Sequence, residues 1–87
     1  MIKTKFYVYV IQSQKDKSLY VGSTIDLSKR IHEHNNNLSK YTKSKSPWEL
    51  IWYCVFSDKE KAERFEKYLK SGSGRAFINK RIKNNPP

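Results

Sequence analysis

Cysteine is almost absent from this sequence of 87 residues, which contains only Cys54. A single cysteine excludes an internal disulfide, and its place in the apolar run LIWYCVF favours a small buried core residue over a nucleophile. Long hydrophobic runs are missing as well, because tyrosines interrupt the short apolar stretch of MIKTKFYVYVIQ. We therefore expect neither a signal peptide nor a membrane-spanning helix, and we expect a cytoplasmic protein.

Acidic residues are scarce too. The chain has 8 Asp and Glu residues against 18 Lys and Arg residues, which gives a formal net charge of +10. Because this excess is spread over the whole chain, it favours polyanionic partners, chiefly nucleic acid, with a merely well-solvated surface as the alternative. The length suits one modest hydrophobic core, so we expect a single domain over residues 1–87.

The secondary structure that the sequence predicts has the order ββαβαα. Runs of β-branched and aromatic residues predict strands at 6–11, 19–23 and 48–56. Patterns with capping or stop residues at their ends predict helices at 26–37, 58–70 and 74–84. We expect Thr24 or Asp26 to cap the first helix, a capping box of Ser57 and Glu60 to open the second, and Gly72 to stop it.

The first predicted helix places polar residues on its apolar stripe. At about 100° per residue, one stripe holds Leu27, Arg30, Ile31 and His34. Leu27 and Ile31 are the residues to bury, which brings Arg30 and His34 onto the same surface. An unpaired guanidinium is costly there, so we expect an anionic partner for Arg30.

The second predicted helix repeats this pattern. Its apolar stripe holds Ala62, Phe65, Glu66 and Leu69. Glu66 is therefore the carboxylate expected to face inward, whereas Glu60 and Glu63 point elsewhere. An internal ion pair between Arg30 and Glu66 would explain both residues without any activity. His34 on its own equally fits a hydrogen-bonded structural histidine.

Gly22 lies at the end of a predicted strand that leads into a helix. A glycine at this place lets backbone or ligand approach closely, and a phosphate would fit there. Two residues before it lies Tyr20, which faces Tyr9 across the predicted hairpin if the register permits. The sequence has no GxxxxGK[ST] loop, HExxH pair or zinc-ligand spacing, so it gives no support to nucleotide hydrolysis or zinc chemistry.

The order of these residues resembles that of the GIY-YIG nuclease superfamily. Its first motif falls on Tyr7-Val8-Tyr9 and its second on Tyr20-Val21-Gly22, with ten residues between the two motif tyrosines. The family's helix arginine corresponds to Arg30, the histidine of one subset to His34, and the metal-binding glutamate to Glu66. The resemblance covers nearly the whole chain. It is nearest to the small single-domain bacterial members related to the excision-repair nuclease subunit, which implies DNA repair.

Some positions depart from the family pattern. Tyr7 replaces the first glycine of the namesake motif, as is usual in the small subset. Ser23 stands where the excision-repair enzymes have a lysine. The late asparagine of several members corresponds to Asn79, with Arg75 and Asn84 as alternative counterparts.

The resemblance implies an α/β fold of the α+β type, in which helices flank a three-stranded antiparallel sheet with the site on one sheet face. It also implies hydrolysis of DNA phosphodiester bonds with one divalent metal ion, Mg²⁺ or Mn²⁺, held by Glu66. Tyr20 would deprotonate the attacking water, Tyr9 would orient that water or the scissile phosphate, and Arg30 would stabilise charge on phosphorus. His34 would bind phosphate or relay a proton.

DNA binding would use a wider set of basic and polar residues. Besides Gly22, the candidates are Lys40, Lys43, Lys45, Lys70, Arg75, Asn79, Lys80 and Arg81. Two alternatives to an enzyme stay open: a catalytically silent nucleic-acid-binding module of the same fold, and a basic structural domain whose polar residues only pair internally. A homodimer and a partner protein are both compatible with the sequence, and no membrane is expected.

Overall fold

The fold is organised around one small antiparallel sheet. The computed structural model describes residues 4–36, 38 and 42–83. The sheet has three strands in the order β2-β1-β3, namely β1 (Phe6–Ser13), β2 (Leu19–Thr24) and β3 (Trp48–Phe56). β1 is central, so β2 and β3 each have an outer edge without a strand partner in the described residues. The predicted strands and the predicted antiparallel sheet are confirmed.

Three α-helices accompany the sheet, namely α1 (Leu27–Asn35), α2 (Lys59–Leu69) and α3 (Gly72–Ile78). A short 3-10 helix at Lys43–Lys45 precedes β3, and a π-helical segment at Asn79–Lys83 continues from α3. The element order confirms the prediction ββαβαα. The last predicted helix, 74–84, is α3 together with this π-helical segment, and it begins earlier than the sequence indicates.

Side-chain caps fix where the helices begin. Asp26 caps α1 and Asp58 caps α2, each by accepting hydrogen bonds from backbone amides of the first turn. The expected capping box at Ser57 is therefore wrong, because the Asp58 carboxylate takes the amides that Ser57 would have bound. α2 ends at Leu69 with Lys70 as its C-cap, and Ser71 caps α3, so Gly72 is the first residue of a new helix and does not itself stop α2.

Gly74 brings α3 close to the end of α2. A Cβ atom at this position would overlap the carbonyl oxygen of Tyr68 and the Cα atom of Leu69. Only glycine leaves room for this approach. The direction in which α3 leaves α2 is therefore set by backbone contact.

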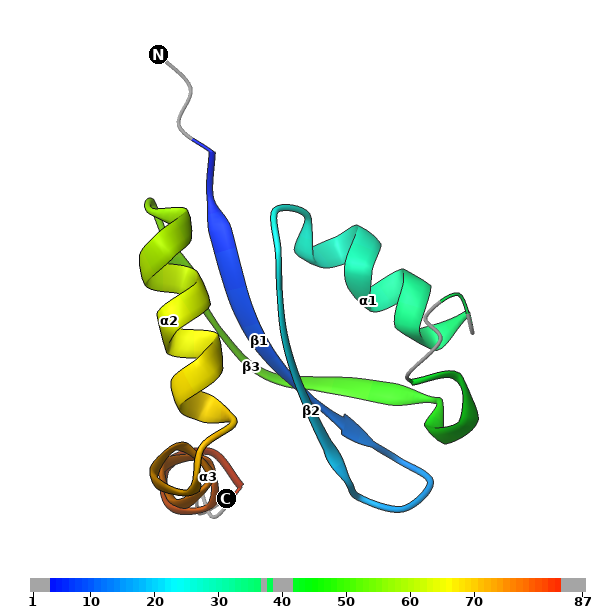
Figure 1. Cartoon of the computed structure of the whole chain (residues 1–87). Helices are drawn as coiled ribbons and strands as arrows, with labels where there is room; N and C mark the ends of the chain where they lie inside the picture. The colour runs from blue at the N-terminus through cyan, green and yellow to red at the C-terminus, as the bar shows by residue number, and fades with distance from the viewer. Residues whose placement is uncertain (1–3, 37, 39–41, 84–87) are drawn as a thin grey trace.

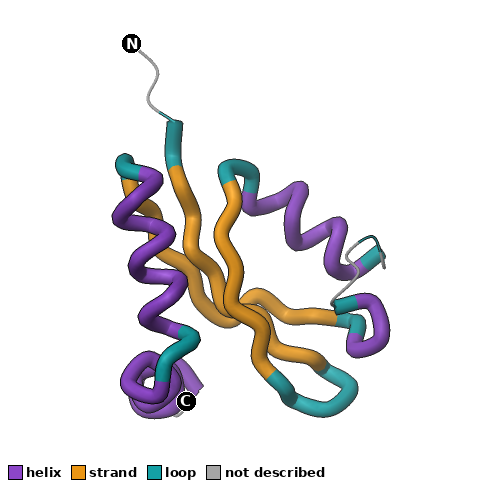
Figure 2. Tube along the Cα trace, in the orientation of Figure 1, coloured by secondary structure: helices purple, strands orange, loops and turns teal. Residues whose placement is uncertain are grey.

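The sheet separates two hydrophobic clusters. α2 and α3 cover one face, and α1 covers the other (Figure 1; Figure 2). The first cluster consists of Val8, Val10, Val21, Ala62, Leu69 and Ile78. The second consists of Tyr9, Ile11 and Trp48, with Leu27 and Ile31 of α1 packed against it. Successive residues of β1 point to opposite faces, which is why Val8 and Tyr9 belong to different clusters.

The single cysteine contributes to the hydrophobic core, as the sequence predicts. Cys54 is half-buried and packs against the cluster under α2 and α3. Burial raises the pKa of its thiol, which agrees with a core residue rather than a nucleophile. No helix within residues 4–36, 38 and 42–83 is long and apolar enough to cross a membrane.

Candidate active site

The edge strand β2 lies between the candidate site residues of α1, Arg30 and His34, and the candidate site residue of α2, Glu66. Tyr9 lies opposite Gly22 and Val8 lies opposite Ser23 in the β1–β2 register. Residues paired across antiparallel strands point to the same face, so Gly22 faces the α1 side and Ser23 faces the α2 side. Two successive residues of β2 therefore contact candidate site residues on opposite faces of the sheet.

The ring of Tyr9 occupies the space above Gly22. A Cβ atom at residue 22 would lie 2.5 Å from the Tyr9 hydroxyl oxygen and 3.1 Å from a ring carbon of Tyr20. The glycine thus makes room for a tyrosine, where the sequence suggests room for a phosphate. Tyr20 pairs with Ile11 rather than with Tyr9, and the two tyrosine rings lie side by side at a centroid distance of 6.5 Å.

A buried chain of hydrogen bonds begins at Tyr9. Its hydroxyl lies 2.8 Å from Nε2 of His34, and Nδ1 of His34 lies 2.7 Å from the hydroxyl of Thr42. The indole of Trp48 donates to the Thr42 carbonyl oxygen at 2.9 Å. All these side chains are buried. Every buried polar side-chain atom in the described part of the chain has a hydrogen-bond partner, so this chain holds the tyrosine in one orientation.

The surroundings keep both titratable members of this chain neutral near pH 7. Burial raises the pKa of Tyr9 to about 12, while hydrogen bonding to Arg30 acts in the opposite direction. Burial and the nearby charge of Arg30 lower the pKa of His34 to about 4. The alternative of a hydrogen-bonded structural histidine thus describes the setting of His34 correctly. Helical spacing gives no indication of Thr42, because this partner comes from beyond the helix.

Arg30 has its anionic partner within its own helix. Its guanidinium donates to Glu33 at 2.9 Å, and this hydrogen bond raises the pKa of Arg30. Both side chains are about 30% exposed and line a cavity of about 260 Å³ that opens beside Thr24 and Asp26. The hydrogen bonding and charge effects between Arg30 and Tyr9 place the guanidinium next to the tyrosine hydroxyl.

Glu66 uses both carboxylate oxygens. Ser23 donates from its hydroxyl to Oε1 at 2.6 Å, and Lys70 donates from its ammonium group to Oε2 at 2.7 Å. The alternative of an internal ion pair between Arg30 and Glu66 is therefore wrong, because Arg30 pairs with Glu33 and Glu66 pairs with Lys70. Ser23 is a site residue that sequence reasoning missed, although it directly follows the second family motif.

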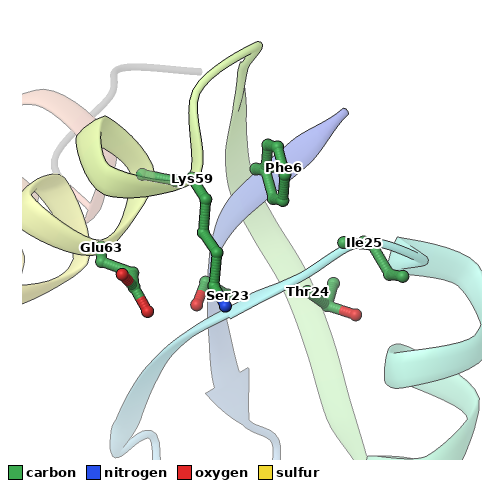
Figure 3. A pocket seen from close by; sticks show the side chains of 7 residues that line it. Phe6, Ser23, Thr24, Ile25, Lys59 and Glu63 are labelled. Carbon is green, nitrogen blue, oxygen red and sulfur yellow. The ribbon is translucent and has the colours of Figure 1, made fainter. Parts of the chain in front are cut away.

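A second acidic side chain lies near the partner of Glu66. Figure 3 shows Glu63 and Lys59 of α2 on one side of a cavity that has Ser23 and Thr24 on the other. This cavity has a volume of about 220 Å³. Glu63 is thus less remote from the site than its helical position suggests.

The donor groups around Glu66 suit one kind of metal ion. The described residues contain no group of three or more His, Cys, Asp and Glu side chains able to share a metal. What they offer is the Glu66 carboxylate with the Ser23 hydroxyl beside it. Mg²⁺ keeps most of its waters and binds through one or two carboxylates, so this oxygen donor set fits such an ion and does not fit zinc.

The expected site residues fall into two groups. Tyr9, Tyr20, Arg30 and His34 lie together between the sheet and α1. Glu66 lies across β2 from them, yet its charge still contributes to raising the pKa of Tyr9. Tyr9 and His34 are 1% and 0% exposed, so these residues do not all line one solvent-accessible concavity.

The candidate DNA contacts occupy two regions. Lys43 and Lys45 lie on the 3-10 helix before β3, where Lys45 pairs with Asp16 at 3.3 Å. The remaining described candidates follow the end of α2 and are all exposed: Lys70, Arg75, Asn79, Lys80 and Arg81. Lys40, and Asn84 as an alternative counterpart of the late asparagine, lie outside the described residues.

Comparisons with known proteins find relatives that cover most of this chain. A UPF0213 protein of Clostridium perfringens is 43% identical over 65 residues, which are 74% of this chain and 69% of that protein. A UPF0213 protein of Streptococcus pyogenes is 40% identical over 77 residues, or 87% of this chain and 83% of that protein. The solution NMR structure of a UPF0213 protein from Bacillus halodurans, 30% identical, has a TM-score of 0.57 and covers 95% of this chain and 88% of its own.

A family model is decisive because it takes in every strand and α-helix described above. The model is that of the GIY-YIG catalytic domain, and it matches residues 5–82. The sequence resemblance is thereby confirmed, and the chain belongs to the GIY-YIG family.

Proposed function

We propose that this protein is a metal-dependent endonuclease that hydrolyses phosphodiester bonds of DNA. The observation that carries the proposal is the junction at β2, where Tyr20 and the neighbouring Arg30 lie on one side and Glu66 is held through Ser23 on the other. Membership of a family described by its catalytic domain supports the same conclusion. We assign the activity to DNA repair on the resemblance to relatives of the excision-repair nuclease subunit.

The proposed reaction is attack of water on the scissile phosphate. Tyr20, acting as its phenolate, accepts a proton from the water, the oxygen of which bonds to phosphorus. The bond from phosphorus to the leaving oxygen breaks, and that oxygen takes up a proton from solvent to become a hydroxyl group. Arg30 stabilises the negative charge that grows on the phosphoryl oxygens. Glu66 would hold a divalent cation, Mg²⁺ or Mn²⁺, which supplies further positive charge at the phosphoryl group when bound.

The buried residues have a supporting role in this proposal. A neutral His34 offers no positive charge to a phosphate, so binding of phosphate by this imidazole is the less favoured of its two expected roles. Its hydrogen bond instead fixes the hydroxyl of Tyr9, which lies beside Arg30 and Tyr20. Tyr9 thus orients the groups that meet the water or the phosphate.

One observation favours a second candidate, the catalytically silent nucleic-acid-binding module. Lys70 already neutralises Glu66, and a protein that needed only to bind DNA would keep this pair permanently. The exposed basic residues after α2 would then provide the whole function.

Nicking of supercoiled plasmid DNA separates the two candidates. We expect nicks with Mg²⁺ or Mn²⁺, none with EDTA, and a loss of nicking in Glu66→Ala. Salt-sensitive DNA binding without nicking under any of these conditions would favour the silent module.

A further inference from the structure

A cavity of about 260 Å³ lies between the outer edge of β2 and α3, and the reaction proposed above involves only Tyr20 of the residues that line it. Tyr20 and Val21 form its wall on the sheet side, and Leu69 and Ile78 form its apolar floor. Its charged lining residues are Lys70 and Arg75, and no acidic side chain lines it among the described residues. The cavity therefore combines an apolar floor with two cationic side chains, of which Lys70 is paired with Glu66 and Arg75 has no ion-pair partner among the described residues.

Arg75 lacks the carboxylate partner that the arginines of α1 and α2 have. Arg30 pairs with Glu33 and Arg64 pairs with Glu60 within their helices. The guanidinium of Arg75 makes neither an ion pair nor a hydrogen bond with any residue in the part of the chain that the structure describes, and its side chain is exposed. Since a guanidinium presents planar, paired donors that match phosphate oxygens, this free group is suited to an anion.

The backbone fixes the position of Arg75. The preceding residue, Gly74, packs directly on the end of α2, and the Arg75 amide donates to the Ser71 carbonyl oxygen at 2.9 Å. α3 therefore holds Arg75 beside Lys70. The outer edge of β2 faces the same space, and edge strands carry backbone amides that are free to donate.

We propose that this cavity binds a backbone phosphate of the DNA strand, next to the phosphate that is cut, with Arg75 and Lys70 as its donors. Two contacts connect this cavity to the proposed catalytic residues. Tyr20 lines the cavity, and the ammonium group of Lys70 lies 2.7 Å from the Glu66 carboxylate. A strand lying across β2 would thus pass from Glu66 to Arg75. The assignment of the neighbouring phosphate rests on the proposed function, whereas binding of a phosphate does not.

Binding of labelled DNA in EDTA tests the site without any cleavage. A series of oligonucleotides, each with one phosphate replaced by a neutral methylphosphonate, is measured against the wild type, Arg75→Met and Arg64→Met. We expect one position at which the neutral group weakens wild-type binding roughly tenfold and has no further effect on Arg75→Met. Arg64→Met removes the same charge from a paired, exposed residue and keeps the wild-type pattern.

Two further measurements test the same site, namely the salt dependence of DNA binding and titration with inorganic phosphate. Arg75→Met should lower the slope of log K against log salt by about one unit, whereas Arg64→Met should change it less. If Arg75 and Arg64 variants weaken binding equally at every methylphosphonate position, the site is wrong. Inorganic phosphate that shifts the Arg75 side-chain NMR signal without any coupled position in DNA would mean a site for free phosphate and would overturn the proposal. Coupling at one position in a protein that never nicks plasmid would support the phosphate site and overturn only the nuclease.

Discussion

The ammonium group of Lys70 lies 2.7 Å from Oε2 of Glu66, while Oε1 accepts the Ser23 hydroxyl at 2.6 Å. The carboxylate proposed to hold a metal ion therefore already has a cation of its own. Lys70 is 52% exposed and one helical turn away, so it can leave without disturbing the core. Metal binding at Glu66 then amounts to replacement of one cation by another.

Glu66→Gln should abolish cleavage and leave the fold intact. The amide keeps a hydrogen-bond acceptor for Ser23 but loses the charge that would hold the metal, so we expect plasmid nicking to fall by about 100-fold or more. The partner Lys70 is exposed, so the free energy of unfolding should change by less than about 1 kcal/mol. Nicking rates and urea unfolding of the same preparations measure both effects.

Glu60→Gln is the matched control, since Glu60 is exposed on the same helix and pairs with Arg64. Glu63 is unsuitable because it lines the cavity next to Ser23 (Figure 3). Equal, wild-type-like nicking by Glu66→Gln and Glu60→Gln would remove Glu66 from the mechanism.

Lys70→Met should strengthen metal binding at Glu66. The substitution removes the competing ammonium group, and exposed ion pairs contribute about 0.2–1 kcal/mol, so the Kd for Mn²⁺ should fall by up to about fivefold. Electron paramagnetic resonance of free Mn²⁺ measures this directly. Lys67→Met, which alters an exposed lysine in the same part of the helix, should have a smaller effect, and unchanged or weaker Mn²⁺ binding in Lys70→Met would contradict the competition.

Stability should fall on acidification because of His34. The pKa of this buried imidazole is lowered from 6.5 to about 4, so the unfolded state binds more protons than the folded state between these values. The contribution is complete above about pH 6.5, is lost as the pH falls towards 4, and amounts to about 3 kcal/mol. Urea unfolding at a series of pH values should lose this slope in His34→Gln and keep it in His32→Gln, which changes an exposed residue of the same helix. A slope that survives in His34→Gln would assign it to other groups.

Gly22→Ala should destabilise the fold and displace Tyr9. The added methyl group meets the Tyr9 hydroxyl at 2.5 Å, so the ring must move away from His34, and overpacking of this kind costs about 1–3 kcal/mol. Thermal unfolding provides the measurement. Gly72→Ala is the control, because no atom lies within 4 Å of a Cβ at that position, and its stability should stay within about 0.5 kcal/mol of the wild type. Equal stability of the two variants would mean that Tyr9 can relax freely.

The sequence predicts the elements of this fold well because their patterns are local. β-branched and aromatic runs mark all the strands, and one stripe on each of α1 and α2 meets the sheet. The error at Ser57 arises because Asp58 binds the same amides, and Gly72 begins a new helix because the Ser71 hydroxyl caps α3. Such competition is decided by geometry that a pattern does not contain.

The candidate site is only partly predictable for a different reason. Two similar helical stripes do not say that their helices cover opposite faces of the sheet, so the sequence alone leaves an ion pair between Arg30 and Glu66 open. Contacts between distant segments, such as those of Ser23 with Glu66 and of Thr42 with His34, leave no periodic signal in the sequence. Family motifs locate the tyrosines, but they do not reveal which residues support them.

Because Gly74 packs directly on the backbone at the end of α2, α3 has a fixed position relative to α2. This backbone contact keeps the distance between Glu66 on α2 and Arg75 on α3 constant when a ligand binds between them. If a metal ion on Glu66 and the guanidinium of Arg75 each contact a phosphate, this fixed separation suits one spacing of phosphates along a strand. In an A-form duplex the backbone follows another path, so we expect such a duplex to contact only one of these two groups, the metal ion on Glu66 or the guanidinium of Arg75.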